Sequence, residues 1–493
     1  MIPYPEFLCC NRSTRIDLYP TATKDRTAMA APELVLRFPG PAQVSVAYDG
    51  TDSSQFPFTN PVTDKDRSDI RWYVETYGAQ SLADPDDAEA RRIQARLSAI
   101  GKALFNAVFA DHRAAERLFN RFQDADGEHR VLTIDTQNAA ILSLPWELLH
   151  DPTGVYLFRE KPHISVRRRI SGATGGRSPF ALQAKPQPHL LFVVSRPDDA
   201  GFIDPRTDPA AVLDALEHHA PGRVTGEFLR PATLNALHER LDDDTRPPVD
   251  IPHFDGHGVF HQVSEQDAKA DPGRFGRSIQ SEIQRERQAR GDTQNDAPVG
   301  IGFLLFEKAD GCGQLIAAQD LADNLFRARV GLVVVSACQS AALDREGDPM
   351  ASVAGRLTAT GIPAILAMTH SVPAATTRTL FGRFYLSLAR GRGIADALDD
   401  ARAWLANNPE KFEVRRGDGR RMLELQDWFL PALFQAGADA PLLTADGAPT
   451  AAAARTHNLR PAHEAGFFGR RREIWQIERW FAAETGGCSW VLT

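Results

Sequence analysis

The segment Ile251-Pro-His-Phe-Asp-Gly-His-Gly258 is a short, largely apolar run that ends in a histidine followed by a glycine. A second segment, Val333-Val-Val-Ser-Ala-Cys-Gln339, is a largely apolar run that ends in a cysteine followed by a glutamine. Both have the length and composition of buried strands. From His189 to about residue 440, such runs alternate with amphipathic, helix-like segments. This alternation predicts an α/β fold with a doubly wound, mainly parallel sheet flanked by helices.

Composition and pattern divide the remainder of the 493 residues into further units. Before residue 171, strand-like runs lie on both sides of a long helix-like stretch, which indicates an N-terminal α/β half. The predicted order is a loose leader (1–28), an N-terminal α/β half (29–170), a Gly/Ser/Arg/Pro-rich linker (171–188), a second α/β half (189–440), an Ala/Pro/Thr-rich linker (441–465) and a terminal segment (466–493).

Residues 261–299 interrupt the second half with a polar insert. The insert is dense in Gln, Glu, Asp, Arg and Gly and has few large apolar residues. A segment of this kind buries too little surface to offset the entropy of ordering. We therefore expect a mobile loop here.

Charge and hydropathy exclude several classes of protein. There are 56 Lys and Arg against 64 Asp and Glu, a formal net charge of −8 that is spread along the chain. The sequence contains no basic domain or stripe of the kind that binds nucleic acid, so nucleic acid binding is not expected. No apolar run approaches the ~20 residues of a membrane span, and the first thirty residues lack the apolar core of a secretion signal. These features predict a cytoplasmic protein.

Cysteine usage points away from structural roles. The five cysteines are odd in number and form no CxxC pair, so a disulfide framework or a zinc finger is not expected. The positions are Cys9, Cys10, Cys312, Cys338 and Cys488. Cys312 lies in a predicted turn, and Cys9, Cys10 and Cys488 lie outside the predicted sheet. At least one thiol is therefore expected to be free for chemistry.

The two strand ends carry the residues best suited to chemistry. The carboxyl ends of parallel strands meet at one edge of a sheet, where ligands and catalytic groups gather. A thiolate nucleophile needs a nearby imidazole, and its reaction needs backbone N–H groups aimed at the developing oxyanion. His257 offers a base, Gly258 an approachable N–H, and Cys338 a thiol. A cysteine–histidine site at this edge is therefore one hypothesis.

Simpler interpretations compete with it. A lone cysteine after an apolar strand is often a small buried hydrophobe. His253 and His257 resemble a metal pair by spacing, but Gly256 and the strand context do not fit the helical geometry that such pairs need, so no metal and no cofactor are expected. His253 is placed as a packing or orienting residue. Asp255 is placed as an orienting or pocket residue for His257, or as a cap of the turn.

Taken together, short motifs across residues 30–440 resemble the CHAT family, the bacterial caspase-like proteases of the separase/caspase clan. The matching pieces are Leu144-Pro-Trp-Glu-Leu-Leu149, Ser195-Arg-Pro197, His253-Phe-Asp-Gly-His-Gly258, Val335-Ser-Ala-Cys-Gln-Ser340, Val353-Ala-Gly-Arg-Leu357, Gly361-Ile-Pro-Ala364 and Phe384-Tyr-Leu-Ser-Leu-Ala389. The resemblance implies a caspase-like fold and a cysteine endopeptidase. It implies that His257 is the general base, Cys338 the nucleophile, and the N–H groups of Gly258 and Cys338 the oxyanion hole. It also implies that Trp146 lies in the core of a partner half.

The resemblance leaves the cleavage preference open. Relatives that cut after basic residues often supply an acid just after the strand that follows the catalytic cysteine. Here that segment is Met368–Ala375, with Ala374 where an acid is expected, which argues against a preference for Arg or Lys. Asp198, Asp199 and Asp344 are further candidates for a pocket acid, each also explained as a surface or turn carboxylate.

The terminal segment carries a second resemblance. Phe468-Gly-Arg-Arg-Arg-Glu473, a following helix and Ser489-Trp-Val-Leu-Thr493 resemble the start of a STAND-type (NACHT or AAA-like) ATPase module. ATP would then bind in a following module that these residues do not include. This resemblance implies the effector part of a longer bacterial sensor for defence or cell death; the other interpretation is an ordinary terminal helix and strand. For the chain as a whole, the expected partners are a protein substrate and an attached or associated sensor, with no nucleic acid or membrane, and oligomers on activation. The alternative is a catalytically silent caspase-like module that recruits partners.

Overall fold

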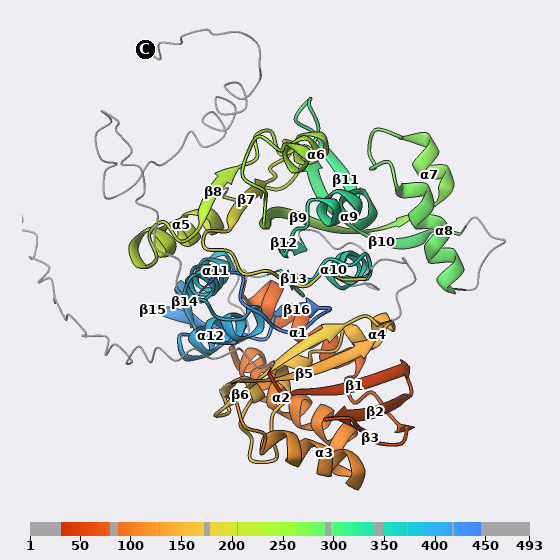
Figure 1. Ribbon diagram of the computed structural model, residues 1–493, viewed down its shortest axis with the longest axis vertical. Helices are drawn as coiled ribbons and strands as arrows, with labels where there is room; N and C mark the ends of the chain where they lie inside the picture. Colours follow the sequence, from red (N-terminus) through yellow and green to blue (C-terminus); the bar gives the residue numbers. More distant parts are fainter. Residues whose placement is uncertain are drawn as a thin grey trace, which may run out of the picture. The chain divides into compact units, whose positions relative to one another are not determined.

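Figure 1 shows the computed structural model of the chain. The structure describes residues 31–78, 87–127, 129–171, 178–204, 206–290, 297–339, 349–371, 373–416 and 419–444. The predicted leader (1–28) and the predicted ATPase-type segment (466–493) lie outside these ranges, as does the linker 441–465 beyond residue 444. What the sequence predicts for those segments stays a prediction.

One mixed sheet organises the described residues. Its strands are β1 (Glu33–Gly40), β2 (Gln43–Tyr48), β3 (Thr51–Asp52), β4 (Phe56–Pro57), β5 (His129–Thr136), β6 (His163–Arg169), β7 (His189–Val194), β8 (Thr225–Phe228), β9 (Ile251–Val263), β10 (Val299–Glu307), β11 (Gly313–Ala317), β12 (Leu332–Gln339), β13 (Ala364–Met368) and β16 (Pro431–Gln435). Fourteen of the described strands join it, in the order β11-β10-β9-β12-β13-β16-β6-β5-β1-β2-β3, with β7 and β8 branching from β9 and β4 pairing with β2. A separate hairpin pairs β14 (Glu410–Arg416) with β15 (Gly419–Glu424).

The strands around the predicted histidine and cysteine are parallel. β8, β7, β9, β12 and β13 all pair in this way, and every residue of β7 and of β13 is buried. Strands covered on both faces are apolar throughout, which is why these runs stand out in the sequence. Antiparallel strands are added at β16, at β10 and β11, and at β2 to β4. The predicted mainly parallel α/β sheet is confirmed.

Helices cover both faces of the sheet. They are α1 (Asp64–Arg71), α2 (Asp87–Phe105), α3 (Arg113–Gln123), α4 (Ala139–Leu142), α5 (Thr207–His219), α6 (Leu234–Asp242), α7 (Glu265–Ala270), α8 (Ile279–Arg290), α9 (Ala318–Arg327), α10 (Pro349–Ala359), α11 (Ala374–Ala389) and α12 (Ile394–Asn407), with short π-helical turns η1 (Trp72–Tyr77) and η2 (Asn106–Ala110) and 3-10 turns η3 (Trp146–Leu148) and η4 (Leu157–Arg159). No helix in the described part of the chain has the length and apolarity to cross a membrane.

In the second half, alternate residues of β7 point to opposite faces of the sheet and show which helices cover each face. Phe192 and Val194 of β7 join the apolar cluster that contains α5, α11 and α12, whereas Leu191 and Val193 join the cluster that contains α6, α9 and α10. Figure 1 shows the two groups of helices on the two sides of β9 and β12. The face covered by α5 and α11 is the one on which the candidate site is built.

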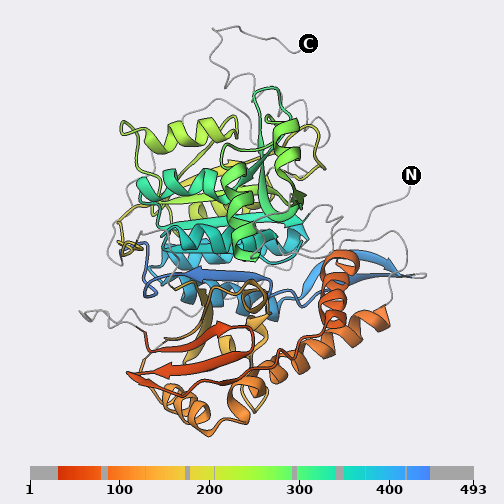
Figure 2. The ribbon, with the colours of Figure 1, turned by 90° about the vertical axis from the view of Figure 1, so that its right-hand side faces the viewer.

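The two predicted halves share the sheet. β16 pairs with β13 of the second half and, at Phe434 and Arg168, with β6 of the N-terminal half. Figure 2 shows the blue strand β16 between the orange-yellow and the green-cyan parts of the sheet. Trp146 is fully buried there, as predicted for a core residue, and its Nε1 donates to the Ile141 carbonyl at 2.7 Å. The next residue, Glu147, forms a buried ion pair with Arg168.

The prediction of a mobile loop at 261–299 is wrong for the residues that the structure describes. β9 continues to Val263, α7 and α8 follow, and β10 begins at Val299. The capping box of Ser264 and Asp267 starts α7. The few apolar residues are sufficient because they converge on one small cluster, formed by Val263, Ala268, Phe275, Ile279, Ile283, Val299, Ile301, Phe303, Leu315 and Ala317. The polar composition of the insert as a whole did not reveal that its few apolar residues pack together.

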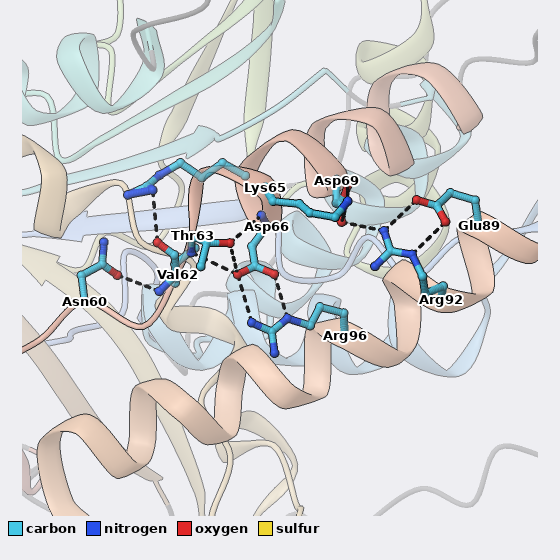
Figure 3. A network of polar contacts seen from close by, with 10 residues as sticks. Asn60, Val62, Thr63, Lys65, Asp66, Asp69, Glu89, Arg92 and Arg96 are labelled. Atoms are coloured by element: carbon cyan, nitrogen blue, oxygen red, sulfur yellow. Dashed lines mark hydrogen bonds and ion pairs between the residues drawn. The ribbon is translucent and has the colours of Figure 1, made fainter.

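Ion pairs join α1 to α2 within the N-terminal half (Figure 3). Thr63 and Asp66 form the capping box of α1, and Arg96 of α2 donates to Asp66 at 2.7 Å and 3.0 Å. The hydrogen bond from Arg96 is the main reason that the pKa of Asp66 lies below its ordinary value. This arrangement fixes η1, whose Tyr73 hydroxyl accepts a hydrogen bond from the Gln426 N–H at 2.9 Å.

Candidate active site

β9 and β12 bring the two predicted catalytic residues side by side. In the parallel ladder between these strands, His257 is the register partner of Cys338, and Gly258 is that of Gln339. Adjacent parallel strands lie about 4.8 Å apart, and registered positions share a face of the sheet. The structure describes the backbone of β12 as far as Gln339, and residues 340–348 lie outside the described ranges.

The site lies where β9 changes its neighbour. On the edge away from β12, β9 pairs with β7 up to Asp255 and with β10 from Gly258 onward. The chain leaves β7 at Ser195, whose N–H donates to the Asp255 carbonyl at 2.9 Å. His257 therefore occupies the point at which one strand departs and another begins.

His257 is buried and held by the loop that follows β7. Its Nε2 lies 2.7 Å from the Gly201 carbonyl oxygen. Since a carbonyl only accepts, Nε2 carries the hydrogen, and Nδ1 is the basic nitrogen of the neutral ring. Burial lowers the pKa of His257 below its ordinary value, the bond to Gly201 opposes this, and the Arg196 charge adds to it. The ring is therefore neutral near pH 7 and suited to accept a proton.

Asp255 pairs with Arg196 of the same loop. Arg196 Nη2 donates to Asp255 Oδ1 at 2.7 Å, and both residues are buried. Burial raises the pKa of Asp255 to about 6, the Arg196 charge opposes this, and the Asp208 charge adds to it. Asp255 lies within β9, so the alternative that it caps a turn is wrong.

His253 lies deeper on the same face. Its ring stacks on Tyr385 and meets the edge of Phe381, and its Nδ1 lies 3.1 Å from the Tyr385 hydroxyl. Its Nε2 is 3.6 Å from Asp208 Oδ2. Although burial opposes ionisation of Asp208, the neighbouring His253 imidazole helps to keep the pKa of Asp208 below its ordinary value. His253 is thus engaged with α5 and α11.

No group of three or more metal-ligating side chains occurs among the described residues. His253 and His257 belong to one face of β9, but they have separate partners, Tyr385 for one and Gly201 for the other. The described geometry thus offers no two-histidine metal site.

The predicted pocket acids have structural partners. Asp199 Oδ1 accepts from the Gly313 N–H at 2.8 Å, which ties the loop after β7 to the β10–β11 hairpin. The Asp198 N–H donates to the Gly311 carbonyl at 2.9 Å. Asp344 lies outside the described residues. Cys312 lies in the turn predicted for it, and the Asp310 charge raises the pKa of its thiol.

An acid that the sequence did not suggest lies at the segment after β13. The Ser371 N–H donates to Glu75 Oε1 at 3.2 Å, so η1 of the N-terminal half contacts the segment in which Ala374 stands where an acid was expected. Nothing near Glu75 in the sequence signals this contact. Arg196 and Gly201 were also missed, although their place directly after the buried strand β7 was an available signal.

Comparison with known proteins adds a family and distant structural neighbours. The CHAT domain family matches residues 42–450. The Arg-specific cysteine proteinase gingipain R (RGPB) is 9% identical with a TM-score of 0.35, and the match covers 85% of this chain and 80% of that chain. The Saccharomyces cerevisiae separase in its complex with securin is 7% identical with a TM-score of 0.40, over 82% of this chain and 30% of that chain. No curated protein matches the sequence.

Proposed function

Because the chain belongs to the CHAT domain family, we propose that it is a caspase-like cysteine endopeptidase in which Cys338 is the nucleophile and His257 the general base. The observation that carries the proposal is the register of β9 and β12, which pairs His257 with Cys338 across two neighbouring strands. The neutral, buried state of His257 supports it, since a base must be unprotonated to activate a thiol.

The proposed reaction proceeds through an acyl-enzyme. Nδ1 of His257 takes the proton of the Cys338 thiol, and the thiolate attacks the scissile carbonyl carbon. The N–H groups of Gly258 and Cys338 donate to the oxyanion. The C–N bond then breaks as the imidazolium gives its proton to the leaving amine. A water molecule, deprotonated by His257, cleaves the thioester and releases the acid and the thiol.

The wider role follows from the resemblance. A protein substrate, an attached or associated sensor, and an effector role in bacterial defence or cell death are proposed on that ground. ATP binding is proposed for a following module. The competing function is a catalytically silent caspase-like module that recruits partners.

Labelling with electrophiles distinguishes the two functions. The chain is incubated with a panel of peptidyl acyloxymethyl ketones that differ at the residue before the warhead, and modified cysteines are located by mass spectrometry. We expect selective modification of Cys338 that is lost in His257→Ala. Cys312 is an internal control, because the Asp310 charge keeps its thiol protonated and it has no histidine-dependent role. No modification of Cys338, or equal modification in His257→Ala, would favour the silent module.

A further inference from the structure

The loop between β7 and α5 lies against the candidate dyad and is anchored at several points. Its Gly201 carbonyl accepts from His257, and Asp199 binds the β10–β11 hairpin. At its start, the Arg196 N–H donates to the carboxylate of Glu307 at 2.8 Å. Glu307 ends β10 and is itself buried.

The side chain of Arg196 connects both ends of this loop to β9. At the start of the loop, Nη1 donates to the Ser195 carbonyl at 2.8 Å, and at its end Nε donates to the Ile203 carbonyl at 3.0 Å. On β9, Nη1 donates to the Asp255 carbonyl at 2.5 Å and Nη2 to its carboxylate at 2.7 Å. Gly201 lies between the two bound ends. The position of its carbonyl therefore depends on the guanidinium.

We propose that Arg196 and Asp255 are positioning residues for His257, acting through the loop whose Gly201 carbonyl holds the imidazole. The inference rests on the proposed function. The planar fork of the guanidinium donates at the same time to carbonyls of the loop, to the Asp255 carbonyl and to the Asp255 carboxylate. A lysine ammonium is a compact group and cannot reach all of these acceptors at once. The Asp255 carboxylate keeps the fork in place. With the loop held, Nε2 stays protonated and Nδ1 remains the nitrogen that serves the thiol.

Two conservative variants test the proposal. Arg196→Lys keeps the charge but loses the fork, and Asp255→Asn keeps the shape but loses the charge. The readout is the rate at which iodoacetamide alkylates Cys338, followed by mass spectrometry, because this small probe needs no knowledge of the substrate. Misplacement of a catalytic group by about 1 Å costs about 100-fold, so we expect both variants to slow alkylation by about 10- to 100-fold. The Cys312 rate in the same samples should not change.

A second readout separates positioning from simple loss of structure. In protein labelled with 15N-histidine, long-range 1H–15N spectra report which ring nitrogen carries the hydrogen, and the His257 signals are identified by their loss in His257→Ala. We expect the Nε2–H form in the parent protein and a mixture of both forms in Arg196→Lys and Asp255→Asn. Thermal melting confirms that each variant is folded at the assay temperature.

Two controls match the variants. Arg240→Lys on α6 removes another buried guanidinium, which donates to Glu227 and to the Pro247 carbonyl. Phe202→Ser changes an exposed residue of the loop between β7 and α5. Both should keep the parental alkylation rate and ring form. Parental values in folded Arg196→Lys and Asp255→Asn would overturn the positioning role. A parent whose Cys338 rate is indifferent to His257→Ala would instead overturn the proposed function.

Discussion

Replacing Glu147 by glutamine should destabilise the fold by about 3–5 kcal/mol, the cost of breaking a buried ion pair from one side. The side chains of Glu147 and Arg168 are each 1% exposed. Arg168 also donates to the carbonyls of Leu142 at 2.7 Å and Leu144 at 2.9 Å, so its guanidinium stays in place when the carboxylate is lost. Glutamine fits the space, but its NH2 group cannot accept from the guanidinium.

The size of the effect follows from the contacts. Two unit charges 4 Å apart interact by about 4 kcal/mol at an effective dielectric constant of 20, and the bidentate hydrogen bonds add to this. Arg402 loses a second, longer contact at 3.6 Å, but keeps its ion pair with Asp399 at 2.7 Å. The loss is therefore dominated by the uncompensated charge of Arg168.

Urea unfolding followed by far-ultraviolet circular dichroism measures the change. Asp52→Asn is the matched control, because its ion pair with Arg37 is 60% and 48% exposed and should contribute less than about 1 kcal/mol. In a double-mutant cycle, Arg168→Met should cost much less in the Glu147→Gln background than alone. A loss below about 1 kcal/mol in Glu147→Gln, with an unchanged m-value, would refute this account of the buried ion pair.

Three further changes test other parts of the structure. Asp66→Asn should lower the free energy of unfolding by about 1 kcal/mol at pH 7, a value discounted because Arg96 is partly exposed. Since the Asp66 pKa is depressed in the folded state, this stabilisation is present above the unfolded pKa of about 3.9 and is lost as pH falls through the folded value, so urea titrations of the two proteins should converge in acid. Gly101→Ala should lower the melting temperature strongly, at a cost of about 3 kcal/mol, because its Cβ would lie 1.9 Å from the Leu148 carbonyl oxygen. Ile283→Ala should cost about 2–5 kcal/mol in urea unfolding, because Ile283 is fully buried in the cluster under α8.

Each of these three predictions would be contradicted by a specific result. A difference between Asp66→Asn and the parent that stays constant from pH 7 to pH 2 would exclude the carboxylate as its source. Gly40→Ala, whose Cβ would meet no atom within 4 Å, should melt like the parent, and an equal loss in both glycine variants would contradict the steric argument. A change below about 0.5 kcal/mol in Ile283→Ala would show that α8 does not pack as described.

Much of the fold was predictable because its signals are local. Strands buried on both faces are apolar throughout, so β7, β12 and β13 were visible as runs, and the helices between them were visible by their period. The same logic placed His257 and Cys338 at strand ends. That is wrong for His257, because β9 continues to Val263, and the two residues are neighbours through the parallel register of β9 and β12. The prediction of a mobile loop at 261–299 failed because α7 and α8 pack on a few apolar residues that only the folded chain brings together.

The sequence by itself determined the α/β class, the strand runs, and the histidine and the cysteine that two of these runs carry, because periodicity and composition act over a few neighbouring residues. Only the tertiary structure decided the register that pairs His257 with Cys338, the change of neighbour along β9, the contact of Glu75 with Ser371, and the hold of Arg196 on the loop at Gly201. These features join segments that are distant along the chain. Their geometry depends on how the whole sheet closes, which no local pattern encodes.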